Sequence, residues 1–234
     1  MFEYHHRSHS KFSIKMIYTN ELRKVIITSN ILLAPNVYLP SFKRDFDFKP
    51  GQWIAIGLNA IENPRLYSIA SGKQNDEINI LYDIKPEGIL TPNMANLKKG
   101  DELFISKPDG SFFGKQGKGW LIAAGTGIAP FKAMLESGLC EDKKLLHGGR
   151  TLNSFYFENE FKSAFGDNYI RCCSQQKGNG VFEGRVTDFL NQQENLPADE
   201  IYYLCGSSEM VVETRDILVD KGIPFGNIIA EIYF

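Results

Sequence analysis

The sequence predicts two folded units of different class: an antiparallel β unit, then an α/β unit built on a parallel sheet. Residues 24–107 contain short apolar stretches, rich in Ile, Val, Leu and aromatics, that are separated by turn residues. This pattern is typical of a small antiparallel barrel or sandwich. From about residue 120, apolar strands alternate with helix-like stretches, which indicates a parallel sheet with helices on both faces. Residues 110–119, GSFFGKQGKG, hold four glycines, so we place the boundary there, with units at 23–114 and 115–234.

Each unit divides into elements in chain order. The first is expected to form strands from KVIITSNILLA (24–34), GQWIAIGL (51–58), RLYSIAS (65–71), EINILYDI (77–84) and DELFISK (101–107). In the second, the expected strands are WLIAAG (120–125), KLLHGG (144–149), YIRCCSQ (169–175), IYYLCGS (201–207) and IIAEIYF (228–234). The expected helices are TGIAPFKAMLESG (126–138), SFYFENEFKSAF (154–165), RVTDFLNQQ (185–193) and SEMVVETRDILVDKG (208–222). Residues 1–22 have no clean period and are interpreted as a mobile polar extension, in which Met16 is an alternative start.

Composition and charge exclude several classes of protein. The chain has 234 residues, 43% hydrophobic and 23% charged, which is typical of a globular protein. Its net charge is −2, divided as +2 over residues 1–114 and −4 over residues 115–234, so a nucleic-acid binder is not expected. No apolar run is long enough for a membrane span, and the N-terminus has no signal-peptide pattern. We therefore expect a cytoplasmic protein, and a monomer.

The four cysteines, Cys140, Cys172, Cys173 and Cys205, include no CxxC pair. This argues against a disulfide framework, a zinc site and an iron–sulfur domain. Reduced thiols and no metal are the expectation.

Two turns of the second unit are candidates for a nucleotide site. GTGIAP (125–130) lies between an apolar strand and a helix, where glycines and free amides can approach a phosphate, and Pro130 suits an early helical position. LCGSSEM (204–210) occupies the same kind of place after another strand, at the edge where parallel sheets bind ligands. The alternative interpretations are a purely structural turn for the first and a buried core thiol for Cys205.

Two stretches of the first unit are candidates for an anion and ring site. In RLYSIAS, alternation puts Arg65 and Tyr67 on one face and Leu66 and Ser68 on the other. An arginine can pair with phosphate, and a tyrosine can lie against a conjugated ring. In EGILTPNM (87–94), Thr91 is the expected N-cap and Pro92 the first helical residue, which again favours an anion. The alternative for RLYSIAS is a strand with one exposed polar face.

Five stretches in order, RLYSIAS, GILTPNM, GTGIAPF, CGSSEM and the closing EIYF, together resemble the motifs of the ferredoxin–NADP(+) reductase family, in its bacterial ferredoxin/flavodoxin reductase branch. The resemblance covers residues 24–234. It implies an antiparallel flavin-binding β-barrel followed by a Rossmann-like parallel-sheet nucleotide-binding domain. It also implies transfer of a hydride between NADP(H) and FAD, and of single electrons to or from ferredoxin or flavodoxin, an acidic electron carrier.

The resemblance also implies roles for single residues. The catalytic set would be Ser68, Cys205, Glu231 and Tyr233, with Glu231 on a proton path and Tyr233 stacked on the isoalloxazine. FAD would be bound by Arg65, Leu66, Tyr67, Ser68, Tyr82, Ile84, Gly88, Ile89, Leu90 and Thr91, with Tyr233 over its ring and Phe234 nearer its adenine. NADPH would be bound by Gly125, Thr126, Gly127, Ile128, Ala129, Pro130, Arg150, Thr151, Ser174, Gln175, Arg185, Gly206 and Met210.

NADPH is favoured over NADH because Arg150 and Arg185 match positions that are often basic in this branch, and Ser174 matches a hydroxyl position. Gln175 replaces the usual arginine, which weakens phosphate recognition. FMN is less favoured than FAD, because Gly88–Thr91 supplies a seat for a pyrophosphate. Two alternative functions stay open: a reductase component of an oxygenase system, and a flavin-bound electron-transfer or regulatory subunit of a larger complex.

Overall fold

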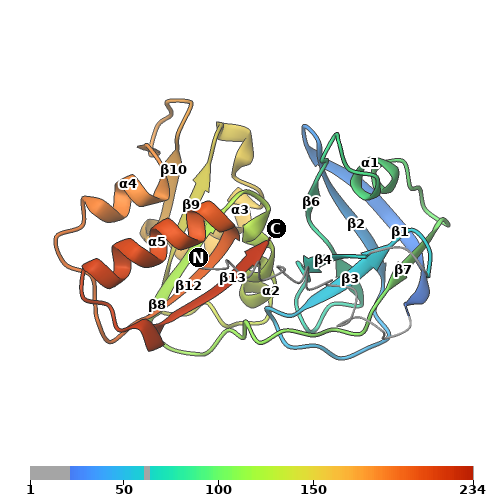
Figure 1. Ribbon diagram of the computed structural model, residues 1–234, viewed down its shortest axis with the longest axis horizontal. Coiled ribbons are helices and arrows are strands. Elements are labelled where there is room, and N and C mark those ends of the chain that lie inside the picture. Colours follow the sequence, from blue (N-terminus) through green and yellow to red (C-terminus); the bar gives the residue numbers. More distant parts are fainter. Residues whose placement is uncertain (1–21, 61–63, 234) are drawn as a thin grey trace, which may run out of the picture.

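The computed structural model describes residues 22–60 and 64–233, without the side chain of Tyr233. The expected extension at residues 1–22 lies outside this range except for Leu22, and Phe234 lies outside it too. Two units stand side by side, the β unit on the right and the α/β unit on the left of Figure 1. Both units belong to the classes that the sequence predicts.

The β unit is one curled antiparallel sheet. Its strands are β1 (Arg23–Ala34), β2 (Val37–Lys43), β3 (Trp53–Gly57), β4 (Arg65–Ser68), β5 (Glu77–Asn79), β6 (Tyr82–Asp83) and β7 (Glu102–Ile105). They follow the order β4-β3-β7-β1-β2-β5, and β6 also pairs with β2. A fully buried core that includes Phe42, Ile54, Ile56 and Ile78 fills the inside of the curl. The helix α1 (Leu90–Ala95) lies between β6 and β7 in the chain.

Two details of this unit depart from the predicted strands. β2 was not among the expected strands, and it contains Pro40, which lacks a backbone N–H. Pro40 nevertheless lies opposite Asn30 of β1, and its carbonyl accepts a hydrogen bond from the backbone N–H of Ile80 over 3.1 Å. The stretch 77–84, expected as one strand, is divided into β5 and β6 around an isolated bridge between Ile80 and Ile69.

The α/β unit is built on an all-parallel sheet of six strands. These are β8 (Gly119–Ala124), β9 (Lys143–Gly149), β10 (Tyr169–Cys173), β11 (Phe182–Glu183), β12 (Ile201–Ser207) and β13 (Ile228–Tyr233). Their order, β11-β10-β9-β8-β12-β13, reverses direction between β8 and β12. Open parallel sheets bind ligands beyond the carboxyl ends of their strands at such a reversal.

Helices cover both faces of the sheet. Leu121, Ala123 and Cys205 pack with α2 (Ala129–Glu136) and α3 (Glu158–Phe165). The opposite face packs with α4 (Val186–Asn191) and α5 (Ser208–Asp220). Short 3₁₀ turns lie at η2 (Gly125–Ile128), η3 (Leu152–Ser154), η4 (Gly166–Asn168) and η5 (Phe225–Asn227). The third helix begins later than the predicted residue 154, because Phe157 has a left-handed backbone (φ 59°) that a helix cannot continue through.

The two units share one buried core. Val37, Ala70 and Leu81 of the β unit are buried in the same cluster as Ile128 and Phe131 of the α/β unit. The proposed boundary at residues 114 and 115 falls in the segment that joins β7 to β8. Along the described part of the chain, no helix combines the length and the apolar character that crossing a membrane requires.

Candidate functional site

The turn after β8 and the end of β12 are packed directly against each other. A Cβ atom added at Gly127 of η2 would lie 2.3 Å from the carbonyl oxygen of Cys205 and 2.8 Å from the Cα of Gly206. Only glycine therefore allows this approach. A Cβ at Gly125 would meet nothing within 4 Å, although its φ of +57° is one that other residues rarely adopt. The two glycines thus have different roles: Gly127 permits close packing, and Gly125 leaves open space at the end of the strand.

The two units meet at a polar contact beside this edge. Ser68, the last residue of β4, donates from its hydroxyl to Oε2 of Glu231 on β13, over 3.0 Å. Glu231 is the parallel-register neighbour of Cys205, and Cys205 is the neighbour of Ala123 on β8. Neighbours in register share a face of the sheet, so Cys205 and Glu231 point to the same side. The structure thus brings together three of the four residues of the predicted catalytic set.

Ser68 and Cys205 are both buried, at 3% and 0% exposed. The thiol of Cys205 belongs to the shared core cluster, which is the alternative that the sequence left open for it. Its backbone also forms the wall against which Gly127 packs.

An aromatic pair lines the β unit next to Ser68. The rings of Tyr67 and Tyr82 meet edge to face, with centroids 6.2 Å apart, and Tyr82 stacks on Tyr38 at 5.8 Å. Burial raises the pKa of Tyr67, and the nearby Asp83 raises it further. Tyr67 therefore stays a neutral, half-buried ring at physiological pH. Arg65, two residues earlier on the strand, is exposed.

The start of α1 corrects one prediction. Thr91 is not the N-cap and Pro92 is not the first helical residue: the helix begins at Leu90, and Ile89 is its N-cap. The hydroxyl of Thr91 is already engaged, because it accepts a hydrogen bond from the backbone N–H of Lys85 over 2.8 Å. It braces the preceding turn instead of capping the helix. Ile89 supplies no side-chain cap, and it is 77% exposed.

The residues predicted to favour NADPH over NADH lie in two places. The backbone N–H of Gln175 donates to the carbonyl of Arg150 over 3.0 Å, and that of Ser174 to Gly149 over 3.0 Å, so these residues are neighbours beyond β9 and β10. Arg185, the N-cap of α4, instead lies 3.6 Å from Glu209 of α5. Both partners are largely exposed, and such pairs stabilise little. Arg150 is thus the cation that accompanies Ser174 and Gln175.

The residues predicted to bind a cofactor or to be catalytic fall into three groups by exposure. Those that are exposed are Arg65, Gly88, Ile89, Arg150, Ser174, Gln175 and Arg185. Those of intermediate exposure are Leu66, Tyr67, Ile84, Leu90, Gly125, Thr126, Thr151, Met210 and Glu231. Those that are buried are Ser68, Tyr82, Thr91, Gly127, Ile128, Ala129, Pro130, Cys205 and Gly206. Tyr233 ends β13 opposite Ser207, but its side chain, like the whole of Phe234, is outside the described residues.

These residues fit a flavin dinucleotide and a nicotinamide dinucleotide. Arg65 offers an exposed guanidinium, and Tyr67 offers an aromatic face near the unit boundary. The first amides of α1 have no side-chain cap competing for them, which suits the pyrophosphate of a flavin dinucleotide. The open space at Gly125, at the sheet reversal, suits the second pyrophosphate. The fit rests on the chemistry of these donors and on the room around Gly125.

Comparison with known proteins agrees with this fit. The family described as oxidoreductase NAD-binding domain matches residues 121–216. The chain is 29% identical over 198 residues to the reductase component of propane 2-monooxygenase from Mycolicibacterium goodii, covering 76% of this chain and 57% of that protein. It is 29% identical over 211 residues to the ferredoxin–NADP reductase of Pseudomonas aeruginosa, covering 75% of this chain and 80% of the relative.

A solved structure shares the whole architecture. The ferredoxin NADP+ reductase of Neisseria gonorrhoeae, determined with bound FAD and NADP, superposes with a TM-score of 0.80 at 20% identity. The match covers 92% of this chain and 99% of the other. The two units are therefore arranged in the same order and fold as in that structure. By these matches the chain is similar in sequence to ferredoxin–NADP reductases and to reductase components of oxygenases, and it shares their fold.

Proposed function

We propose that the chain is an FAD-dependent NAD(P)H oxidoreductase that delivers electrons to a separate protein acceptor. The observation that carries this proposal is the contact between Ser68 and Glu231. It joins the strand of the flavin motif to β13, whose neighbour β12 borders the point where the sheet order reverses. The two candidate cofactor sites therefore meet at one place.

When bound, the flavin accepts a hydride from the reduced nicotinamide and can release electrons one at a time. The protein supplies binding, orientation and exclusion of water. Arg65 and the first turn of α1 would hold the flavin pyrophosphate, and Tyr67 would support its ring. Gly125–Pro130 would hold the pyrophosphate of the nicotinamide dinucleotide. The Ser68 hydroxyl and the Glu231 carboxylate, 3.0 Å apart, would form a short path for a proton to a bound flavin.

The test is direct. The purified protein is expected to carry the yellow absorption of bound FAD, and NADPH under anaerobic conditions is expected to bleach it. A colourless protein that binds no added FAD, or a flavin that neither NADPH nor NADH reduces, would contradict the proposal.

The acceptor is proposed to be a ferredoxin or flavodoxin. The relatives point to three classes, since they are named a ferredoxin–NADP reductase, a reductase component of a monooxygenase, and a probable electron transfer subunit of dihydroorotate dehydrogenase B. The first class is favoured because the chain covers 80% of that relative, against 74% of the dehydrogenase subunit and 57% of the monooxygenase component. The test is whether this protein catalyses the reduction of ferredoxin or flavodoxin by NADPH. Electron transfer only to an oxygenase component would contradict the proposed acceptor.

We expect NADPH to be used more efficiently than NADH, and Arg150 to carry the preference. Arg150→Gln removes the cation next to Ser174 and Gln175, and should lower kcat/KM for NADPH about 5- to 10-fold with little change for NADH. Gln175→Arg should change kcat/KM in the opposite direction, since it adds a charged donor beside Arg150. Arg215→Gln, on α5 and paired with Asp216, is the matched control outside the predicted site. Wild-type efficiency that is equal or better with NADH would contradict the preference.

Ser68→Ala should slow the reduction of bound flavin by NADPH more than it weakens NADPH binding. The change deletes the hydroxyl that holds Glu231 at the junction, but leaves the strand and its packing in place. Loss of one positioned polar group in such a site costs about 10- to 100-fold in rate. Stopped-flow absorbance at saturating NADPH gives the rate, and its concentration dependence gives the affinity. An unchanged limiting rate would remove Ser68 from the catalytic set.

A further inference from the structure

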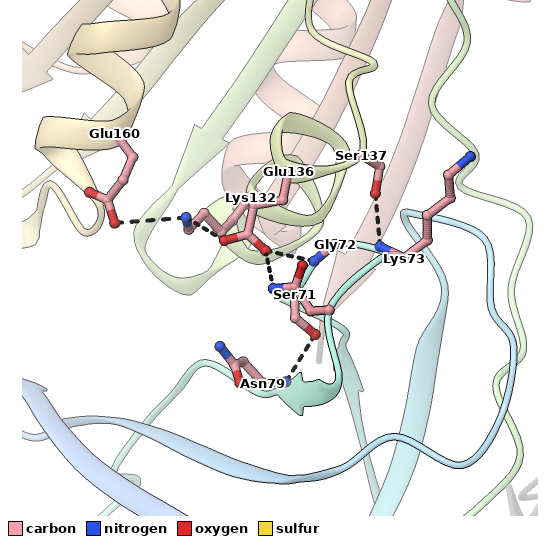
Figure 2. Close-up of polar contacts among 9 residues, drawn as sticks. Ser71, Gly72, Lys73, Asn79, Lys132, Glu136, Ser137 and Glu160 are labelled. Atoms are coloured by element: carbon pink, nitrogen blue, oxygen red, sulfur yellow. Dashed lines mark hydrogen bonds and ion pairs between the residues drawn. The ribbon is translucent and has the colours of Figure 1, made fainter.

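A second polar junction joins the two units, away from Ser68. Glu136, the last residue of α2, accepts through Oε2 from the backbone N–H of Gly72 (2.6 Å) and from Nδ2 of Asn75 (2.9 Å). The next residue, Ser137, accepts from the backbone N–H of Lys73 over 3.0 Å. Figure 2 shows Gly72 and Lys73 facing Glu136 and Ser137. We call Gly72, Asn75, Lys132 and Glu136 the Glu136 clamp.

The carboxylate at the centre of the clamp is held from both sides. Its other oxygen, Oε1, lies 2.7 Å from Nζ of Lys132, one helical turn earlier on α2. Lys132 is also 3.7 Å from Glu160 of α3, and its ammonium lies 5.3 Å from the centre of the Phe157 ring. The side chains of Lys132 and Glu136 are only 10% and 26% exposed. Since charge-assisted hydrogen bonds are stronger when they are shielded from water, this carboxylate is a rigid anchor.

The two units also touch through their backbones here. A Cβ added at Gly72 would lie 2.6 Å from the Cβ of Glu136 and 3.1 Å from its carbonyl carbon. No side chain larger than hydrogen fits without moving the helix. On the β-unit side, the hydroxyl of Ser71 accepts from the backbone N–H of Asn79 over 3.0 Å, which secures the loop that carries Gly72 (Figure 2). The clamp therefore joins two braced segments, not two mobile ones.

The position of the clamp in the chain gives it a consequence for the site. Gly72 follows Ser68 by four residues, on the continuation of the strand that bears the flavin motif. Glu136 ends α2, whose start follows directly on the η2 turn of the nicotinamide site. One contact thus ties together the two short segments that carry the two cofactor sites. Neither Lys132 nor Glu136 belongs to either site.

We propose that Glu136 is a positioning residue: through Gly72 and Asn75 it sets the distance between the flavin-binding strand and the nucleotide-binding helix. The inference rests on the proposed function, because the consequence that it predicts is a rate of hydride transfer. Hydride transfer needs the donor carbon of the nicotinamide and the acceptor nitrogen of the flavin to be within contact distance. A displacement of about 1 Å can cost about 100-fold in rate. Affinity for each cofactor depends mainly on the residues of one unit, so it should change little.

Two substitutions test the clamp from opposite sides. Gly72→Ala inserts a methyl group into the contact, and Gly226→Ala is its matched control, since a Cβ at Gly226 meets nothing within 4 Å. Glu136→Ala removes the anchor, and Glu213→Ala, at an exposed position of α5, is its control. Stopped flow gives the limiting rate of flavin reduction and the affinity for NADPH. Hydrogen exchange of the amides at positions 72 and 73, measured on the protein without NADPH, reports the contact without any reaction.

Both clamp variants are expected to reduce the flavin at least about tenfold more slowly, with affinities for FAD and NADPH within about twofold of wild type. In Glu136→Ala the amide of Gly72 should exchange about tenfold faster or more. Wild-type limiting rates in variants whose amides do exchange faster would overturn the positioning role. Unchanged exchange would overturn the clamp itself. A wild-type flavin that NADPH never reduces would count against the proposed function, while the exchange experiment would still decide the clamp.

Discussion

Gly127→Ala is expected to abolish binding of the nicotinamide dinucleotide and to lower the free energy of unfolding by about 1–3 kcal/mol. The added Cβ would lie 2.3 Å from the carbonyl oxygen of Cys205 and 2.6 Å from its carbonyl carbon. These are backbone atoms of a central strand, with Ala123 and Glu231 in register on either side, so they cannot move aside cheaply. The η2 turn must shift instead, and with it the amides proposed to hold the phosphates.

Titration with NADPH and urea unfolding at neutral pH would measure the two effects. Gly226→Ala is the control for the substitution itself, because it adds the same methyl group in open space. Gly125→Ala separates packing from backbone strain. A Cβ there meets nothing within 4 Å, but the φ of +57° is unfavourable for alanine. The free energy of unfolding should therefore fall by about 1 kcal/mol, while much of the NADPH binding is retained. Full NADPH binding by Gly127→Ala would show that the turn is not part of the site.

The stability of the protein is expected to fall steeply below pH 6.5, because His147 is buried in an uncharged form. His147, on β9, is 0% exposed, and Nδ1 lies 2.9 Å from the hydroxyl of Tyr169. Phe155 packs edge to face on its ring at 5.3 Å. Among the described residues, Nε2 has no hydrogen-bond partner. Burial, and secondarily the charge of Arg171, lowers the pKa of His147 to about 3.

The sign follows from proton binding in the two states. An unfolded histidine titrates near pH 6.5, so between pH 6.5 and about 3 the unfolded chain holds a proton that the folded chain does not. The penalty is absent above pH 6.5 and grows as the pH falls, by about 1.4 kcal/mol per unit. At pH 4.5 it amounts to about 3 kcal/mol, a large part of the stability of an ordinary domain.

The measurement is the difference in unfolding free energy between wild type and His147→Asn, from pH 7.5 to 4.5. The other titrating groups are common to both proteins and largely cancel in this difference. His147→Asn keeps a polar group near Tyr169, and His147→Phe, which adds to the surrounding aromatic cluster, is the second variant. The free energy of unfolding of each variant, relative to wild type, should rise by about 1.4 kcal/mol for each pH unit below pH 6.5. A difference that stays constant with pH would contradict a neutral, buried His147.

Local pattern was enough to predict most of the architecture. Alternating buried strands and helices, with Gly-rich turns after β8 and β12, predict the parallel sheet, and the structure has these elements in the predicted order. The signal is local because a strand buried on both faces must be apolar along its whole length. Pro130 lies in the first turn of α2, as expected, because its ring suits a position that needs no N–H donor.

Where local signals compete, tertiary contacts decided the outcome. Pro40 lacks the N–H that a strand ladder uses, but it lies within a strand that pairs with β1 and β5. Thr91 reads as a helix cap, but its hydroxyl is taken by the backbone of Lys85. In each case the local pattern allows more than one role for the residue, and the contacts that form in the folded chain decide between them.

The chemistry of the site divides in the same way. The motif residues are recognisable because phosphate binding needs glycines, an arginine and helix starts within a few residues of one another, which leaves a local signature. The contacts that hold the two units together leave none: Ser68 and Glu231 are 163 residues apart, and Gly72 and Glu136 are 64 apart. A serine, a glycine or a glutamate has no distinctive pattern by itself. Its partner is set only when both units have folded and packed, since the energy of such a contact depends on a geometry that chain separation does not encode.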